Sequence, residues 1–373
     1  MTKTAISILI FAISFAFFSC TDDDHSLAEI IALSDNNFSN DTIYVEYNGS
    51  VVTVKGDDYN LITTDGADVT ANIIDTTAFY VFVLSGTSTD GQFKTYASHK
   101  FGIVLNNLTL SNNDGPALNN QCHKSLYLTC PAGTTNTLSD GTSYTETTED
   151  QKGALFSEGQ ILFSGAGSLN ITGNCKNAIA CDDYISIDST IAITATSISS
   201  NGIKVNDGIH INGGTLSIIV SADGAKGIKC DSIVNITGGD INITTSGDYL
   251  IETTDGVTDT STCAGIKCSG TMTMSAGTLT ITSTGDGGKG INCDSDIYFT
   301  GGTLNVTCTG DETVSKPKGV KSDAIIYISG GSFTSQSSNA RATDCANADR
   351  YPTILGEPTI KSLAKKKVIV SYE

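Results

Sequence analysis

Aspartates repeat at a regular interval through the second half of this 373-residue chain, and they are the residues best suited to binding a metal ion. One set follows the last strand-like segment of each repeat: Asp223, Asp248, Asp286 and Asp311. A second set follows the first such segment: Asp182, Asp183, Asp207, Asp231, Asp294 and Asp323. Carboxylates beside backbone carbonyls at turns suit calcium, which takes about 6–8 oxygen ligands. The alternative at each position is structural, because an aspartate at a turn also caps the backbone and ends a strand.

Lysines and a few tyrosines are the candidate contacts to a sugar. One lysine column comprises Lys204, Lys229, Lys267 and Lys321, and a second precedes glycine at Lys152, Lys226, Lys289 and Lys318. These lysines could bind sugar carboxylates, or they could neutralise neighbouring aspartates, because stacked like charges are destabilising. The chain has no Trp, so the candidate aromatic platforms are Tyr184 and Tyr249, with Tyr298 and Tyr327 inside strand-like segments.

No constellation of residues points to catalysis. A lyase acting on uronates needs a base and cations that stabilise an enolate-like intermediate, but the two arginines, Arg341 and Arg350, lie beyond the repeats. No lysine stands out from its column, and the four histidines do not cluster in the sequence. We therefore expect no catalytic residue, with a polysaccharide lyase as the alternative. A net charge of −19 argues against a nucleic-acid partner.

The candidate residues belong to a phrase, Gly-Ile-Lys-Cys in its clearest copies, that returns about every 25 residues. Its glycines are Gly202, Gly227, Gly265, Gly290 and Gly319. A fixed period indicates stacked units, none of which can bury its own apolar face. Within one unit, residues 227–230, 232–237 and 240–245 alternate between apolar and polar, which predicts three strands. We therefore predict an all-β, single-stranded parallel β-helix of about 24–25 residues per turn, in preference to a propeller or a sandwich.

Alternation also assigns the two sides of each strand. Isoleucine and cysteine of the phrase share the inner side, and lysine takes the outer side. Cys181, Cys230, Cys268 and Cys293 would form an interior ladder. Because cysteine behaves as a small apolar residue, we expect free thiols; disulfides between neighbouring turns are the alternative in an oxidising compartment.

The organisation of the chain follows from where the period begins and ends. Residues 1–19 resemble a lipoprotein signal peptide, with Lys3 before an apolar stretch too short to span a bilayer. Cys20 would be the lipidated residue, followed by a tether to residue 40. We expect an N-terminal β region and cap over 41–113, the β-helix over 114–340 and a C-terminal cap over 341–373. Polar inserts at 134–151, 249–263 and 312–317 interrupt the period, and inserts at one corner commonly gather on a binding face.

Several ordered motifs resemble a known family. They are Gly133–Gly141, Lys152–Ser157, Gly165–Leu169, the Cys181-Asp182-Asp183 step and the repeated Gly-Gly-Thr-Leu corners. Together, over residues 75–340, they look like the carbohydrate-binding β-helix family first described in a cellulose-degrading clostridium. The resemblance implies a right-handed helix similar to pectate lyases, calcium bound on the surface, and affinity for acidic plant polysaccharide and cellulose.

These inferences combine into one expected function. The acidic residues after Cys20 resemble the surface-export tag of Bacteroidetes lipoproteins. We expect a monomeric, non-catalytic, calcium-assisted polysaccharide-binding lipoprotein exposed on the outer membrane, which touches the membrane only through its lipid. The alternative is a structural or adhesive surface protein without glycan specificity.

Overall fold

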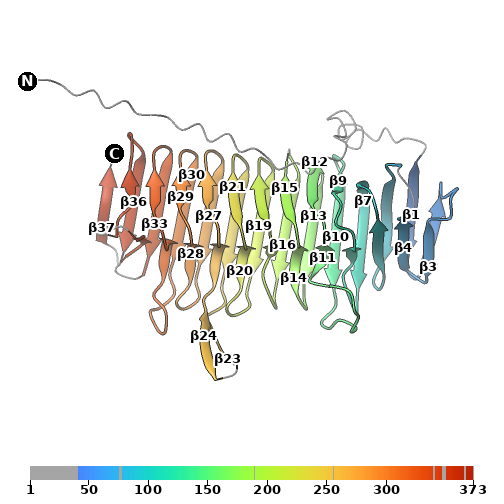
Figure 1. Ribbon diagram of the computed structural model, residues 1–373, viewed down its shortest axis with the longest axis horizontal. Helices are drawn as coiled ribbons and strands as arrows, with labels where there is room; N and C mark the ends of the chain where they lie inside the picture. The colour runs from blue at the N-terminus through green and yellow to red at the C-terminus, as the bar shows by residue number, and fades with distance from the viewer. Residues whose placement is uncertain are drawn as a thin grey trace, which may run out of the picture.

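The computed structural model describes residues 41–74, 78–188, 190–254, 256–338, 341–346, 350–364 and 367–372. Strands in these residues stack side by side along one long axis, from β1 and β3 at one end to β36 and β37 at the other (Figure 1). The expected signal peptide, Cys20 and tether lie outside the described residues. Within them, no helix is long and apolar enough to cross a membrane.

Each turn contributes three strands, as the alternation predicts. The first strands form a 12-stranded sheet, in which only β3 is antiparallel to its neighbour among the described residues. In order, the sheet contains β3 (Ile62–Asp65), β4 (Asp68–Ile73), β6 (Gln92–Ala97), β8 (Leu118–Asn120), β11 (Gly153–Ser157), β14 (Asn177–Cys181), β17 (Ile203–Val205), β20 (Lys226–Cys230), β25 (Ala264–Cys268), β28 (Lys289–Cys293), β31 (Lys318–Ser322) and β34 (Thr343–Asp344). The eleven parallel strands, β4 to β34, mark about eleven turns.

The second and third strands of the turns belong to a 23-stranded sheet that wraps the other two sides. The second strands are β9 (Leu126–Cys130), β12 (Ile161–Gly165), β15 (Tyr184–Ile187), β18 (Gly208–Ile211), β21 (Ile233–Ile236), β26 (Met272–Met274), β29 (Ile297–Phe299), β32 (Ile326–Ile328) and β35 (Thr353–Ile354). The third strands are β10 (Thr135–Asp140), β13 (Ser168–Gly173), β16 (Ala192–Ser197), β19 (Thr215–Val220), β22 (Asp240–Thr245), β27 (Thr278–Ser283), β30 (Thr303–Cys308), β33 (Ser332–Ser337) and β36 (Thr359–Ala364). The predicted right-handed parallel β-helix is confirmed.

The two ends of the stack are closed by antiparallel strands. At the N-terminal end, β1 (Thr42–Asn48) pairs antiparallel with β2 (Val51–Lys55) and parallel with β5 (Val81–Ser88), which pairs parallel with β7 (Phe101–Asn112). Parallel stacking therefore already includes residues before 114, where the sequence suggested a separate β region. At the other end, β37 (Lys367–Tyr372) pairs antiparallel with β36 and covers its edge.

Columns of identical residues fill the interior. Ile203, Ile228, Ile266, Ile291 and Val320 pair in register and are fully buried. The glycine before each of them lies where the third strand of the same turn packs closest. A Cβ at Gly265, for example, would overlap Ile281 and lie 2.8 Å from the carbonyl oxygen of Gly290 in the next turn. The glycine of the repeated phrase is thus required by close packing and not by a turn.

We expect Gly265→Ala to destabilise the protein by about 1–3 kcal/mol, because the added methyl overpacks a core that the next turn holds fixed. Chemical denaturation of the variant and of Thr280→Ala, which removes an outward side chain of the same turn, provides the comparison. An unchanged free energy of unfolding in Gly265→Ala would contradict the packing argument.

Candidate functional site

The outer side of the 12-stranded sheet carries a straight column of polar side chains. Lys204, Lys229, Lys267, Asn292 and Lys321 follow one another in register on successive strands. All of them are half-buried, with their neighbours on the inner side of each strand in the core. We call this column the lysine face.

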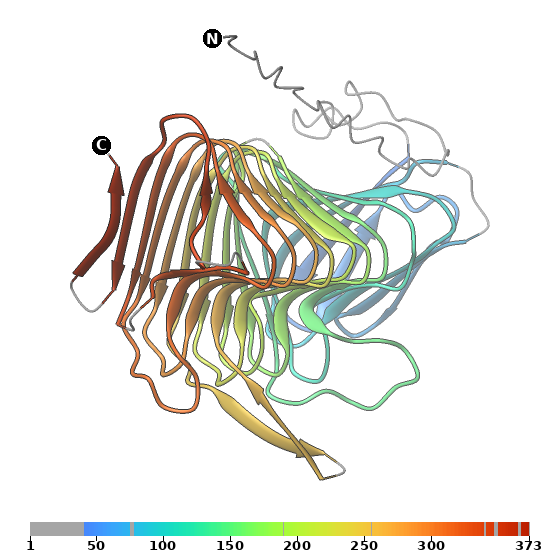
Figure 2. The ribbon, with the colours of Figure 1, turned by 60° about the vertical axis from the view of Figure 1, so that its left-hand side comes forward.

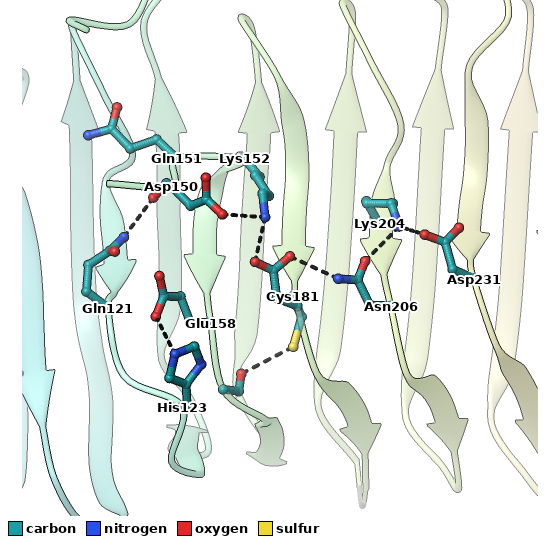
Figure 3. Close-up of polar contacts among 12 residues, drawn as sticks. Gln121, His123, Asp150, Gln151, Lys152, Glu158, Cys181, Lys204, Asn206 and Asp231 are labelled. Carbon is teal, nitrogen blue, oxygen red and sulfur yellow. Dashed lines mark hydrogen bonds and ion pairs between the residues drawn. The ribbon is translucent and has the colours of Figure 1, made fainter. Parts of the chain in front are cut away.

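The N-terminal continuation of the same column is covered. Asn119, Phe156 and Ala180 occupy outward register positions but are buried. The insert between β10 and β11 lies against this part of the sheet, where its Glu149 accepts hydrogen bonds from Lys94 Nζ (2.9 Å) and from the Tyr96 hydroxyl. The amide of Gln121 donates to the Asp150 carbonyl at 2.7 Å (Figure 3). The open lysine face therefore begins at Lys204.

Aspartates of the second set lie along one edge of the lysine face and pair with it. Lys204 contacts Asp231, and Lys267 contacts Asp294, in each case one turn further on (Figure 3 shows the first pair). Lys321 contacts Asp323 of its own turn at 2.5 Å. The arrangement matches the charge-neutralising alternative for these lysines.

Two further aspartates of that set, Asp182 and Asp207, do not pair with the lysine face. Lys152 Nζ contacts Asp182 at 2.6 Å and Asp150 at 2.7 Å. Asp207 does not continue the column of Asp182, because its amide donates to the Asp183 carbonyl, and Asn206 takes the column position instead. Grouping Asp207 with Asp182 and Asp231 was therefore wrong by one residue, since the turn after Val205 has the same length as its neighbours and carries its aspartate one position later, next to Asn206. Burial raises the pKa of Asp183.

Lys229 is the exception on the lysine face. By the pattern of Lys204 and Lys267, its partner would lie one turn further on, and that position holds Ser269. The aspartate of its own turn, Asp231, already pairs with Lys204. The Lys229 ammonium thus has no ion pair or hydrogen bond with the other residues that the structure describes.

The first set of aspartates forms a ladder along the opposite edge of the sheet. The amide of Asp248 donates to Asp223 Oδ1 at 2.8 Å, that of Asp286 to Asp248 Oδ1 at 2.8 Å, and that of Asp311 to Asp286 Oδ1 at 2.9 Å. Each of the three accepting carboxylates satisfies the backbone of the next turn and keeps its second oxygen available. Among the described residues, no group of three or more Asp, Glu, His or Cys side chains is arranged to hold a metal ion.

Comparison with known proteins places this fold. A family model described as "carbohydrate-binding domain-containing protein" matches residues 65–227 and 219–313, well over half of the chain. The chain belongs to this family. Among solved structures, the polysaccharide lyase-like protein from C. thermocellum, a gadolinium derivative, is similar with a TM-score of 0.56 and 20% identity, over 69% of this chain and 96% of that one. A search of curated proteins finds no match. The family resemblance of the sequence motifs is confirmed.

In this member of the carbohydrate-binding family, all three inserts leave the helix at one corner, between a third strand and the next first strand. Figure 2 shows them projecting from the same side of the stack, with the hairpin β23 (Leu250–Thr254) and β24 (Val257–Ser261) reaching furthest. This corner borders the lysine face.

Three of the four lysines before the glycines contact these inserts, and the fourth, Lys318, pairs with Asp344 of β34 at 3.0 Å. Lys152 contacts Asp150 of the first insert, and Lys226 donates to Ser261 Oγ of the hairpin at 2.6 Å. Lys289 donates to Ser315 Oγ at 2.8 Å and to the Lys316 carbonyl at 2.8 Å in the third insert. The sequence shows that this column repeats, but not where the inserts fold, so this role could not be read from it.

The tyrosine candidates do not form one platform. Tyr184 begins β15 after the lysine face, whereas Tyr249 precedes β23 on the insert side. Tyr184 packs edge-to-face against His210, with ring centroids 6.1 Å apart. The rings of Tyr298 and Tyr327 are parallel, with centroids 4.9 Å apart, so each ring covers one face of the other.

The cysteine ladder lies inside the helix. Cys230, Cys268 and Cys293 pair in register, Cys181 lies two turns before them, and all ten cysteines after Cys20 are free thiols. Their Sγ atoms donate to backbone carbonyls of the adjoining corner, for example Cys230 to Ile233 at 3.1 Å. Burial raises the pKa of the Cys181 thiol to about 12, so it stays protonated at neutral pH.

One of the anchoring lysines gives a pH prediction. Burial lowers the pKa of Lys289 from 10.5 to about 8. Between these two values the unfolded chain holds a proton that the folded chain has released, so the lysine's contribution to the free energy of unfolding rises with pH. The rise is about 1.4 kcal/mol per pH unit.

We therefore expect the stability difference between the wild type and Lys289→Met to shift in favour of the wild type between pH 7.5 and pH 9.5, as measured by urea unfolding. Lys361→Met, at an exposed position of β36, is the matched control and should show a constant difference. The same constancy in Lys289→Met would contradict the argument.

Proposed function

We propose that the protein binds acidic plant polysaccharide along the lysine face and does not cleave it. The observation that carries the proposal is the in-register column from Lys204 to Lys321 beside the corner where the three inserts emerge. Its ammonium groups would repeat at the strand spacing of about 4.8 Å, or at multiples of it. Weak contacts at successive turns would then add along one polymer chain.

Lys229 is the contact we assign first. Lys204, Lys267 and Lys321 already have carboxylate partners, and a sugar carboxylate would have to displace them. Lys229 requires no such exchange, because the serine one turn further on carries no charge. A uronate carboxylate above Lys229 would also lie beside Lys204 and Lys267, which adjoin it in the column.

Calcium enters the proposal as a bridge between two anions. A protein of net charge −19 repels polygalacturonate, and the aspartate ladder lies at the edge of the lysine face. Asp223, Asp248 and Asp286 each keep one carboxylate oxygen beyond the one that accepts the next amide. Two such oxygens from successive turns suit a calcium ion, and we assign its remaining ligands to glycan carboxylates and water.

Retention on immobilised polygalacturonate tests the proposal. We expect calcium to support retention and EDTA to abolish it, with no ultraviolet absorbance from unsaturated uronate. Lys229→Gln should weaken retention by roughly two- to fivefold, the effect of one exposed charge pair. Lys361→Gln removes the same charge from a different sheet and should leave retention unchanged.

Other outcomes separate the alternatives. An unsaturated product would make the protein a lyase. Retention on cellulose that is insensitive to EDTA would assign neutral glucan as the ligand, and no retention on either polymer would favour a structural or adhesive role.

We also propose that Cys20 anchors the protein to the outer membrane with the β-helix outside the cell. The support is the order of a charged start, an apolar stretch, Cys20 and then Asp22–Asp24. Metabolic labelling with a fatty-acid analogue should label the wild type and not Cys20→Ser, and protease added to intact cells should degrade the β-helix. A labelled Cys20→Ser variant would exclude lipidation at this residue.

A further inference from the structure

The column of the lysine face continues toward the N-terminal end of the molecule, beneath an insert. From Lys204, its outward register positions pass without a break through Ala180, Phe156 and Asn119 to Lys94 on β6. Lys94 therefore belongs to the same column as the open lysines, although it is separated from them by three covered positions.

The cover is the first insert, residues 141–151, which we call the acidic strap. It contains three acidic residues and no lysine or arginine. Glu149 accepts a hydrogen bond from Lys94 Nζ at 2.9 Å, and Asp150 contacts Lys152 Nζ at 2.7 Å (Figure 3 shows the second pair). The carboxylates of the strap thus bind the cations at this end of the sheet, as the carboxylates of a bound polyanion would.

The ion pairs that hold the strap are open to water. The side chains of Lys94 and Glu149 are 19% and 25% exposed, and those of Lys152 and Asp150 are 39% and 58% exposed. Ion pairs that remain hydrated contribute little to stability and are screened by salt. A second polyanion that offers carboxylates to the same lysines can therefore compete with the strap.

The residues beneath the strap are suited to contact a ligand. Asn119 is buried, and its Nδ2 has no hydrogen-bond partner among the described residues, which is an unfavourable arrangement for an amide. Phe156 points outward from the sheet but is fully buried, with the ammonium of Lys152 5.6 Å from its ring centroid. Displacement of the strap would add a hydrogen-bond donor and an aromatic ring to the column between Lys94 and Lys204.

We propose that the acidic strap is an autoinhibitory element, which a polyanionic glycan displaces so that the binding face extends from Lys204 to Lys94. The inference rests on the proposed function, because it concerns the regulation of the same site. Only molecules with an open strap offer the extended face, so the apparent affinity is reduced in proportion to the open fraction. Weakening the strap should therefore strengthen binding.

Retention of the full-length chain on immobilised polygalacturonate, with calcium present, tests this prediction. We expect Glu149→Gln, which keeps the shape of the side chain, to strengthen retention by roughly two- to fivefold, the effect of one exposed ion pair. Glu146→Gln is the matched control, since this exposed residue of the strap has no ion pair or hydrogen bond with the described residues. Adding Lys94→Gln to Glu149→Gln should remove the gain, because Lys94 then no longer contributes to the face.

Proteolysis measures the opening of the strap without a glycan. Chymotrypsin cleaves after aromatic residues, and Tyr144 of the strap is present in all these variants. We expect cleavage after Tyr144, identified by fragment mass, to be faster in Glu149→Gln than in the wild type and in Glu146→Gln. Equal cleavage rates in the three proteins would overturn the role of Glu149 in closing the strap. Thermal unfolding of each variant shows whether faster cleavage reflects the strap or the whole fold.

The pattern of retention separates this inference from the proposed function. Retention of the wild type with no difference between Glu149→Gln and Glu146→Gln would overturn autoinhibition and leave the proposed function intact. Retention of Glu149→Gln alone would support autoinhibition and show that the closed face does not bind. Retention of none of the proteins would overturn both, because the strap would then cover no binding site.

Discussion

The parallel hydrogen-bond ladder between turns is the constraint on which the rest of this structure depends. It holds successive strands about 4.8 Å apart and in register, so every position of the repeat becomes a column. A residue type must therefore tolerate contact with its own kind. Isoleucine side chains of successive turns pack against one another. The glycine column leaves no room for a side chain, because a Cβ at Gly265 would overlap Ile281 and crowd the next turn. The repeated phrase is the sequence record of these contacts.

In the charged columns, stacking would bring like charges together on successive turns, and the structure neutralises them in two ways. Lysines on the outer face bind aspartates that are displaced by one turn, as in Lys204–Asp231, which spaces like charges apart with opposite ones. Lys289, which precedes a glycine, is buried, and its ammonium donates to carbonyl and hydroxyl oxygens instead of to a carboxylate. Replacing one aspartate by Ser269 breaks the first pattern and leaves Lys229 as the one ammonium on the described lysine face with no partner.

Much of the fold could be predicted from the sequence because its determinants are local. Period-2 alternation and a repeat of about 25 residues define the strands, their faces and their stacking, down to the pairing of Ile228 with Ile266. The site was less predictable, since it depends on single residues and on loops. Asn206 occupies the column position in its turn, so Asp207 lies one residue outside the column. The covering of Phe156 arises where the first insert departs from the repeat.

Inserts at the corner leave the hydrogen-bond ladder between turns intact, so the stability of the stack does not depend on the loops beside the lysine face. Lys226 still pairs with Ala264 although 38 residues separate them, where an uninterrupted turn has 25. The register is kept because the insert leaves and re-enters at adjacent points, held by the hydrogen bond of Lys226 to Ser261. Loop closure costs little for each added residue. In a β-helix of this kind, the inserts beside the lysine face can therefore differ in length and sequence, while the buried columns that stabilise the stack stay the same.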